Sequence, residues 1–284
     1  MRSGVFVVLA FAVSWSLWYA VSPHVHGAGE MALMTAYMFG PLIAALATAA
    51  AFKGGGIRNA LALRFKLNFW WLAAWLAPPV LAFLALQVAL LFPGVDSQSF
   101  RDGALAAAAA AGQQVSDAQS LRLPGFPAIV GIAMLAGILP NSIAAFGEEA
   151  GWRGVLWGDL RRLGFWATSI IVGVIWGLWH APLIIHGHNY GVGYAGFPWL
   201  GIAAMVAFCV LLTPFMGYLR DRTGSVFPAA IFHGTLNAVA GAFILLEKGA
   251  SPLIGGLPGL SGLIVLAGLT IIIAVLRPNR APLG

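Results

Sequence analysis

Charged side chains are scarce in this chain. Only 8% of its 284 residues are Asp, Glu, Lys or Arg, whereas 60% are hydrophobic. Soluble domains carry about 25% charged residues, and long uncharged apolar runs are typical of membrane-spanning helices. The composition therefore excludes a soluble domain. It predicts an all-α polytopic membrane helix bundle that forms a single transmembrane domain over residues 1–284, with the lipid bilayer as its surroundings.

Cysteine and several catalytic motifs are also lacking. The single cysteine, Cys209, lies in an apolar run, so neither an intrachain disulfide nor a Cys-based metal site can form. The chain has no H-E-x-x-H, no G-x-S-x-G, no phosphate-binding glycine loop and no aspartate inside an apolar run. These absences exclude the common zinc-protease helix, the serine nucleophile elbow and an intramembrane aspartate pair.

Eight apolar stretches have about the length of 20 residues that a spanning helix needs. They cover residues 4–22, 32–52, 68–93, 127–158, 166–184, 197–219, 226–246 and 258–276. The first is longer than the apolar region of a signal peptide, which has about 7–15 residues, so we expect a retained helix. Pro140 should break the fourth stretch, and residues 102–120 should form a loop with a short surface helix.

Lysine and arginine predict the orientation, because they favour cytoplasmic segments. The net charge of +6 lies in short segments between the spans, which does not indicate a nucleic-acid partner. With the N-terminus inside, twelve basic residues fall on inner segments: Arg2, Lys53, Arg58, Arg64, Lys66, Arg153, Arg161, Arg162, Arg220, Arg222, Arg277 and Arg280. Three fall outside: Arg101, Arg122 and Lys248. Both termini should therefore be cytoplasmic.

Inserting an ionisable residue at the centre of a spanning helix costs roughly 2.5–3.5 kcal/mol of insertion free energy. Such residues therefore mark buried pairs or functional sites. Glu149 and Arg153 are four residues apart, which places them on one helix face as an ion pair. Glu148 lies about 100° further round the helix and remains free of that pair.

Two further spans contribute His180 and the pair His233 and Asn237, which are also four residues apart. At a rise of about 1.5 Å per residue, all of these side chains can meet with Glu148 in one layer near the middle of the membrane. A carboxylate and a histidine can deprotonate a water, and His with Asn can donate hydrogen bonds to an oxyanion. Glu148, His180 and His233 also match a catalytic zinc ligand set. Either version predicts attack of water on an amide.

At these positions the sequence resembles the type II CAAX prenyl endopeptidase family, also called CPBP or Abi intramembrane proteases. The family motif E-E-x-x-x-R matches "EEAGWR", which begins at Glu148. F-x-x-x-H matches "WGLWH", which ends at His180 and has Trp in place of Phe. H-x-x-x-N matches His233 to Asn237, and the resemblance covers residues 135–240, the motif-bearing core.

The resemblance implies eight transmembrane helices around a site inside the membrane that is open to the cytoplasm. It implies that Glu148 activates the water with help from a histidine, for which we choose His180, and that His233 and Asn237 hold the oxyanion; the two histidines can also be exchanged. Glu149 and Arg153 should give structural support, as their spacing also predicts. A metal-free reaction without cofactor is favoured over zinc.

The resemblance implies a membrane-embedded or lipidated peptide substrate, and prenylated substrates are those of the family's eukaryotic branch. The composition resembles that of bacterial proteins, so we expect a bacterial or archaeal plasma membrane, and we favour a monomer. Two other classes of function stay open. The chain can be a non-catalytic interaction protein of the same fold, such as a bacteriocin-immunity protein, or, with less support, a transporter; no internal repeat of the kind transporters carry is present.

Overall fold

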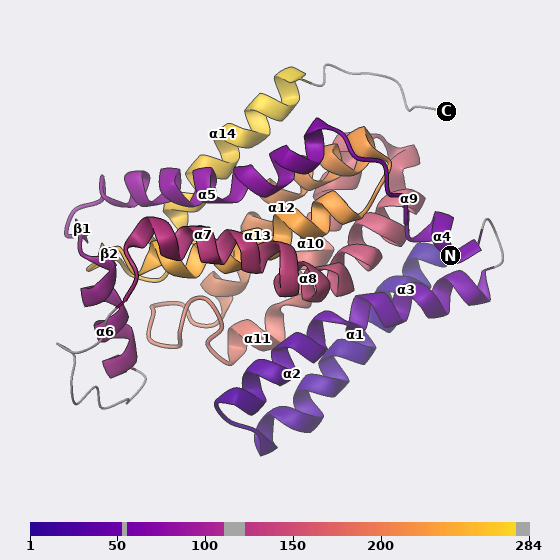
Figure 1. Ribbon diagram of the computed structural model, residues 1–284. Coiled ribbons are helices and arrows are strands. Elements are labelled where there is room, and N and C mark those ends of the chain that lie inside the picture. The colour runs from indigo at the N-terminus through magenta and orange to yellow at the C-terminus, as the bar shows by residue number, and fades with distance from the viewer. Residues whose placement is uncertain (53–55, 111–122, 277–284) are drawn as a thin grey trace.

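The computed structural model describes residues 1–52, 56–110 and 123–276, and nearly all of its regular structure is helical (Figure 1). The helices are α1 (Arg2–Val21), η1 (Ser22–His24), α2 (Ala28–Met38), α3 (Gly40–Ala51), α4 (Gly56–Ala60), α5 (Phe69–Ala89), α6 (Phe100–Ala110), α7 (Phe126–Ala136), η2 (Gly137–Asn141), α8 (Ser142–Glu149), η3 (Ala150–Leu156), α9 (Trp157–Leu160), η4 (Arg161–Leu163), α10 (Phe165–Trp179), α11 (Ala181–Ile185), α12 (Trp199–Thr223), α13 (Phe227–Ile244) and α14 (Leu260–Leu276). The strands β1 (Asp96–Ser97) and β2 (Glu247–Lys248) pair antiparallel.

The prediction of a polytopic membrane helix bundle is confirmed. Among the described residues, six helical segments are long and apolar enough to cross a membrane: Arg2–His24, Ala28–Ala51, Phe69–Ala89, Phe126–Leu163, Trp199–Thr223 and Phe227–Ile244. The shorter apolar helices α10 and α14 occupy the two remaining predicted spans. Each predicted stretch therefore holds an apolar helix, and the chain is an integral membrane protein.

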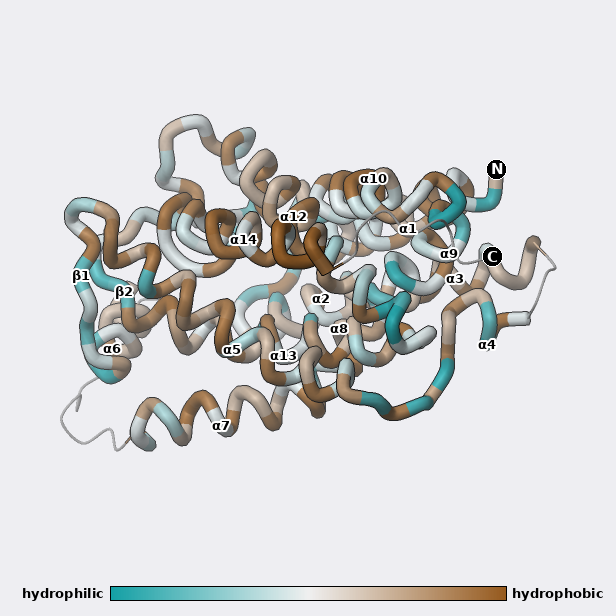
Figure 2. Tube along the Cα trace, turned by 90° about the horizontal axis from the view of Figure 1, so that it is seen from above, coloured by the Kyte–Doolittle hydropathy of each residue, from teal (hydrophilic) through white to brown (hydrophobic). Residues whose placement is uncertain are grey.

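Hydrophilic residues gather at the two ends of the bundle, with mostly hydrophobic segments between them (Figure 2). One end holds α4, α9 and the N-terminus, and the other holds β1, β2 and α6. This separation fits the alternation of basic and less basic segments, although the side that faces the cytoplasm stays a prediction. Lys53, Arg122, Arg277 and Arg280, which entered that prediction, lie outside the described residues.

The count of basic residues on inner segments needs one correction. Arg153 is fully buried inside the bundle and does not lie on a cytoplasmic segment. Its ion pair with a carboxylate, described below, explains why a cation is tolerated there. Residues 102–120 were predicted to form a loop with a short surface helix. Residues 102–110 belong to the helix α6, in agreement with this prediction, and residues 111–120 lie outside the described ranges.

The fourth span is broken at the predicted place. Leu139 has extended dihedral angles (φ −149°, ψ 128°) directly before Pro140, and this separates α7 from α8. Helix α13 packs closely against the break through glycine. A Cβ atom on Gly234 would lie 2.5 Å from the backbone nitrogen of Ser142. This close approach brings the side chains of α13 next to those of α8.

The fifth span is shorter than predicted. Helix α10 ends at Trp179, and the chain turns at His180 before the short helix α11, which has a proline in its first turn. Upstream, Gly173 and Gly177 let α10 approach α12 closely, since a Cβ atom at either glycine would lie 2.5 Å from a valine Cα of α12. The G-x-x-x-G pattern of these two glycines therefore packs two helices of the same chain.

Candidate active site

Two adjacent glutamates close helix α8 at the centre of the bundle. Glu148 is 2% exposed and Glu149 is 0% exposed. The chain continues directly into η3, a π-helical stretch that carries Arg153. Wide π turns of this kind often occur at functional sites. The sequence did not predict this stretch, because no residue type marks it.

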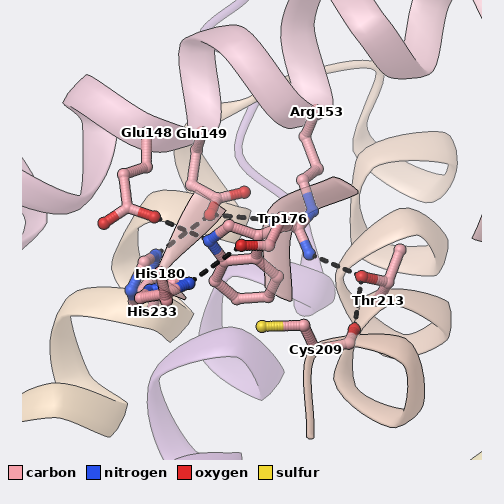
Figure 3. Close-up of polar contacts among 8 residues, drawn as sticks. All are labelled: Glu148, Glu149, Arg153, Trp176, His180, Cys209, Thr213 and His233. Atoms are coloured by element: carbon pink, nitrogen blue, oxygen red, sulfur yellow. Dashed lines mark hydrogen bonds and ion pairs between the residues drawn. The ribbon is translucent and has the colours of Figure 1, made fainter. Parts of the chain in front are cut away.

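The predicted ion pair within this helix is present and fully buried. Arg153 Nη1 donates to Glu149 Oε1 over 3.0 Å, and Arg153 Nη2 donates to the hydroxyl of Thr213 on α12, also over 3.0 Å. The same Oε1 atom of Glu149 accepts from Nδ1 of His233 at 3.0 Å (Figure 3). One carboxylate therefore links the arginine to a histidine of another helix.

Trp176 is the residue that sequence reasoning missed. Its indole Nε1 donates to Glu148 Oε2 over 2.7 Å. The guanidinium carbon of Arg153 lies 4.3 Å from the centre of its ring, so the ring also makes a cation–π contact. Figure 3 places Trp176 between these two side chains. The signal was in the sequence, because a Trp in place of the family's Phe adds one N–H donor.

The two histidines are each held through Nδ1. In His180 this atom lies 2.9 Å from the carbonyl oxygen of Trp176, which can only accept, so His180 Nδ1 carries the proton. In His233 the partner is the Glu149 carboxylate. Both rings therefore have Nε2 left for other contacts.

All four residues predicted to be catalytic line the same cavity. This cavity has a volume of about 430 Å³ and is lined by Glu148, Trp176, His180, His233 and Asn237, together with apolar residues of α2, α12 and α13. Three separate helices supply the polar groups, as expected from the spans. The volume is ample for water and for a peptide segment, since ligand cavities commonly hold roughly 300–1,000 Å³.

The residues of the predicted zinc site, Glu148, His180 and His233, line one cavity but are not arranged as a preformed metal site. In the part of the chain that the structure describes, no group of three His, Cys, Asp or Glu side chains is arranged to hold a metal ion. Glu148 Oε2 accepts from an indole N–H, and each histidine makes its protein contact through Nδ1. Zinc-ligating histidines are commonly held in the same way while Nε2 binds the metal, so these contacts are compatible with either version of the reaction.

Comparisons with known proteins agree with the motifs. Residues 129–239 match the family model "Type II CAAX prenyl endopeptidase Rce1-like". The protein CAAX prenyl protease 2 of Methanococcus maripaludis is 31% identical over 99 residues, which cover 34% of this chain. The aligned part covers 36% of the length of that relative. The family match contains the E-E-x-x-x-R pattern and both histidines. The motifs and these matches show that residues 129–239 of the chain are similar to the Rce1-like, type II CAAX prenyl endopeptidase family.

Proposed function

We propose that the chain is an intramembrane endopeptidase of the CAAX prenyl protease type. Its substrate is a membrane-embedded peptide or a peptide anchored by a prenyl or other lipid group. The observation that supports this most strongly is the common cavity of Glu148, His180, His233 and Asn237, which come from three helices. The name of the archaeal relative supports the same class of reaction.

The reaction starts from a water molecule held between Glu148 and His180. Glu148 takes one proton from this water, and the hydroxide oxygen forms a bond to the carbonyl carbon of the scissile amide. Nε2–H of the doubly protonated His233 and the side-chain amide of Asn237 donate hydrogen bonds to the resulting oxyanion. The proton then moves from Glu148 to the amide nitrogen as the C–N bond breaks, which leaves a carboxylic acid and an amine.

Glu149 and Arg153 are positioning residues in this scheme. They do not line the cavity, and both are fully buried. Glu149 fixes the ring of His233 through Nδ1, so that Nε2 faces the reacting carbonyl. Arg153 in turn fixes Glu149 and supports the ring of Trp176.

The decisive experiment compares cleavage by the purified protein and by the variant Glu148→Gln. The substrates are a farnesylated peptide with a C-terminal CAAX sequence and the same peptide without its lipid. Loss of a general base lowers the rate by about 10²–10⁴-fold, and the variant should keep its fold because Gln can still accept the indole hydrogen bond. Asp102→Asn, an exposed carboxylate on α6, is the matched control and should cleave like the wild type.

Equal cleavage by Glu148→Gln and wild type would rule out the proposed base. If the folded Glu148→Ala variant instead restored the wild-type phenotype in a deletion strain, the non-catalytic interaction function would be favoured.

Zinc is tested separately: cleavage should survive dialysis against a strong chelator, and metal analysis should find less than one zinc per chain. We also propose a monomer in a bacterial or archaeal plasma membrane, which sizing in detergent with a corrected micelle mass can test.

A further inference from the structure

The peptide group that joins Trp179 to His180 is held from both of its sides. Its carbonyl oxygen, which belongs to Trp179, accepts from the hydroxyl of Tyr37 over 2.6 Å and from the indole Nε1 of Trp15 over 3.1 Å. Its N–H, which belongs to His180, donates to the carbonyl oxygen of Gly177 over 3.2 Å. The plane of this peptide group is therefore fixed directly before the histidine.

This plane helps to set the direction of the His180 ring. A peptide group is planar, so the position of its oxygen determines where the following nitrogen and Cα atoms lie. On the other side, the carbonyl oxygen of His180 accepts from the backbone nitrogen of Ile184 over 3.1 Å. The ring itself donates from Nδ1 to the carbonyl oxygen of Trp176 over 2.9 Å. With the backbone and Nδ1 held in this way, the direction of Nε2 is fixed as well.

The carbonyl oxygen of Trp179 needs donors from outside its own helix. Helix α10 ends at this residue, and the last carbonyl groups of a helix have no donor within the helix. The residue is 0% exposed, and a buried carbonyl without a donor is costly. An oxygen with two lone pairs can accept both the hydroxyl and the indole N–H. Tyr37 and Trp15 therefore stabilise the turn between α10 and α11.

Tyr37 is a rigid donor because its own position is fixed on α2. Its side chain is fully buried, and its ring centre lies 4.4 Å from that of Trp179. The ring of Trp18 packs edge-on against it, with 6.1 Å between the ring centres. The carbonyl oxygen of Tyr37 accepts from the hydroxyl of Ser14 over 3.1 Å. Contacts with α1 and α10 thus leave the hydroxyl of Tyr37 little freedom to follow a moving acceptor.

Both donors lie outside the part of the chain that matches the family model. Trp15 belongs to α1 and Tyr37 to α2, which lie along one side of the bundle (Figure 1), whereas the match covers residues 129–239. Neither side chain lines the cavity. The motifs therefore gave no reason to connect these two residues with the site.

We propose that Tyr37 and Trp15 are positioning residues of the active site. Through the carbonyl oxygen of Trp179 they hold His180 in the orientation in which its Nε2 faces the water beside Glu148. The proposal rests on the proposed protease function for the role of His180 in the reaction. It gives the two N-terminal helices a part in the chemistry as well as in the bundle.

Tyr37→Phe tests the proposal, because it removes only the hydroxyl. Tyr190→Phe is the matched control: Tyr190 is 1% exposed, its hydroxyl donates to the carbonyl oxygen of Pro258 over 2.9 Å, and it does not line the cavity. We expect kcat for the farnesylated peptide to fall about three- to tenfold in Y37F with little change in KM, as the loss of one hydrogen bond implies, and to stay at the wild-type value in Y190F. Equal kcat values of Y37F, Y190F and wild type, well below their melting temperatures, would overturn the proposal and leave the protease function intact.

A double-mutant cycle shows whether the effect runs through the histidine. On the residual cleavage by His180→Gln, the added Tyr37→Phe should lower kcat by less than about twofold, because no imidazole is left to position. A further fall as large as in the wild-type background would show a general loss of structure and would overturn the proposal.

NMR of protein with isotope-labelled histidine reads the His180 ring without any substrate. The signal, assigned by its loss in H180Q, should shift or broaden in Y37F and in Trp15→Phe. Trp75→Phe is the control for the second variant, since Trp75 is also half-buried and its Nε1 donates to the carbonyl oxygen of Met134 over 2.9 Å. An unchanged His180 signal in the folded variants would overturn the proposal even if kcat falls. If the wild type cleaves no peptide, the protease function fails, whereas this signal still decides whether the two donors orient His180.

Discussion

Arg153→Met should destabilise the protein strongly, because it breaks a buried ion pair. The methionine keeps much of the side-chain volume but leaves the Glu149 carboxylate without its cation. His233 would then be the partner that the Oε1 atom retains. The hydroxyl of Thr213 would no longer accept a hydrogen bond from Arg153. It would still donate its own hydrogen bond to the carbonyl oxygen of Cys209.

The magnitude follows from the geometry. Two unit charges 3.0 Å apart attract each other by about 5–6 kcal/mol at an effective dielectric constant of about 20. The cost of burying both ions reduces the net value of the pair, but removing one partner leaves an uncompensated charge, which typically costs about 3–5 kcal/mol. The cation–π contact of Arg153 with Trp176 contributes to the same loss. We therefore expect the free energy of unfolding to fall by about 3–5 kcal/mol.

A double-mutant cycle measures this coupling. The variants are Arg153→Met, Glu149→Gln and the two combined, and the assay is reversible unfolding in mixed micelles. The double variant should be more stable than the sum of the single losses predicts, with an interaction energy of about 1–3 kcal/mol. Arg162→Met, at an exposed position, is the control and should change stability by less than about 0.5 kcal/mol. Strict additivity, or an Arg153→Met loss no larger than that of the control, would refute the structural role of the pair.

Three other variants give separate tests. Trp176→Phe removes the hydrogen-bond donor to Glu148 but keeps an aromatic ring. Because a hydrogen bond to a charged group is worth about 1.5–3 kcal/mol, kcat for peptide cleavage should fall about tenfold or more with little change in KM. An unchanged kcat would contradict this role of Trp176. Gly177→Ala should lower the melting temperature, because the added Cβ atom would meet the backbone of α12. Gly268→Ala is the control and should not lower it, because a Cβ atom there has no neighbour within 4 Å. Equal melting temperatures of the two variants would contradict the packing argument. Burial raises the pKa of the Glu247 carboxyl on β2 above 4.5, while its hydrogen bond from the Gly256 backbone N–H opposes the shift. The folded protein therefore binds this proton more tightly than the unfolded chain, and the free energy of unfolding should fall as the pH rises from 4.5 through the raised pKa and stay lower above it. Glu247→Gln should flatten this dependence in thermal unfolding curves, and an unaltered curve would count against it.

The sequence predicted the spans because length and hydropathy alone decide which helices can cross a bilayer. It also predicted the break at Pro140 and the pairing of Glu149 with Arg153, since both follow from local backbone chemistry. The turn at His180 was missed, although Pro182 gave a local signal for it. The apolar composition of the stretch continued past the turn and hid the end of α10.

Contacts between helices could not be predicted in the same way. The bond between Glu149 and His233 joins residues 84 positions apart and depends on how α8 and α13 are rotated about their axes. Hydropathy carries little information on that rotation in a membrane, where lipid and helix interior are both apolar. The sequence argument therefore found the residues of the layer but not which carboxylate contacts which histidine.

A single oxygen atom, Oε1 of Glu149, accepts hydrogen bonds from both Arg153 and His233. The stability of the bundle and the orientation of the His233 ring thus depend on the same acceptor atom. Selection for a folded protein is therefore enough to preserve Glu149. A similar protein without proteolytic activity can therefore retain the second glutamate and the arginine of the E-E-x-x-x-R motif. In the proposed reaction, the loss of proteolysis would instead be seen at the cavity-lining residues, first of all at Glu148.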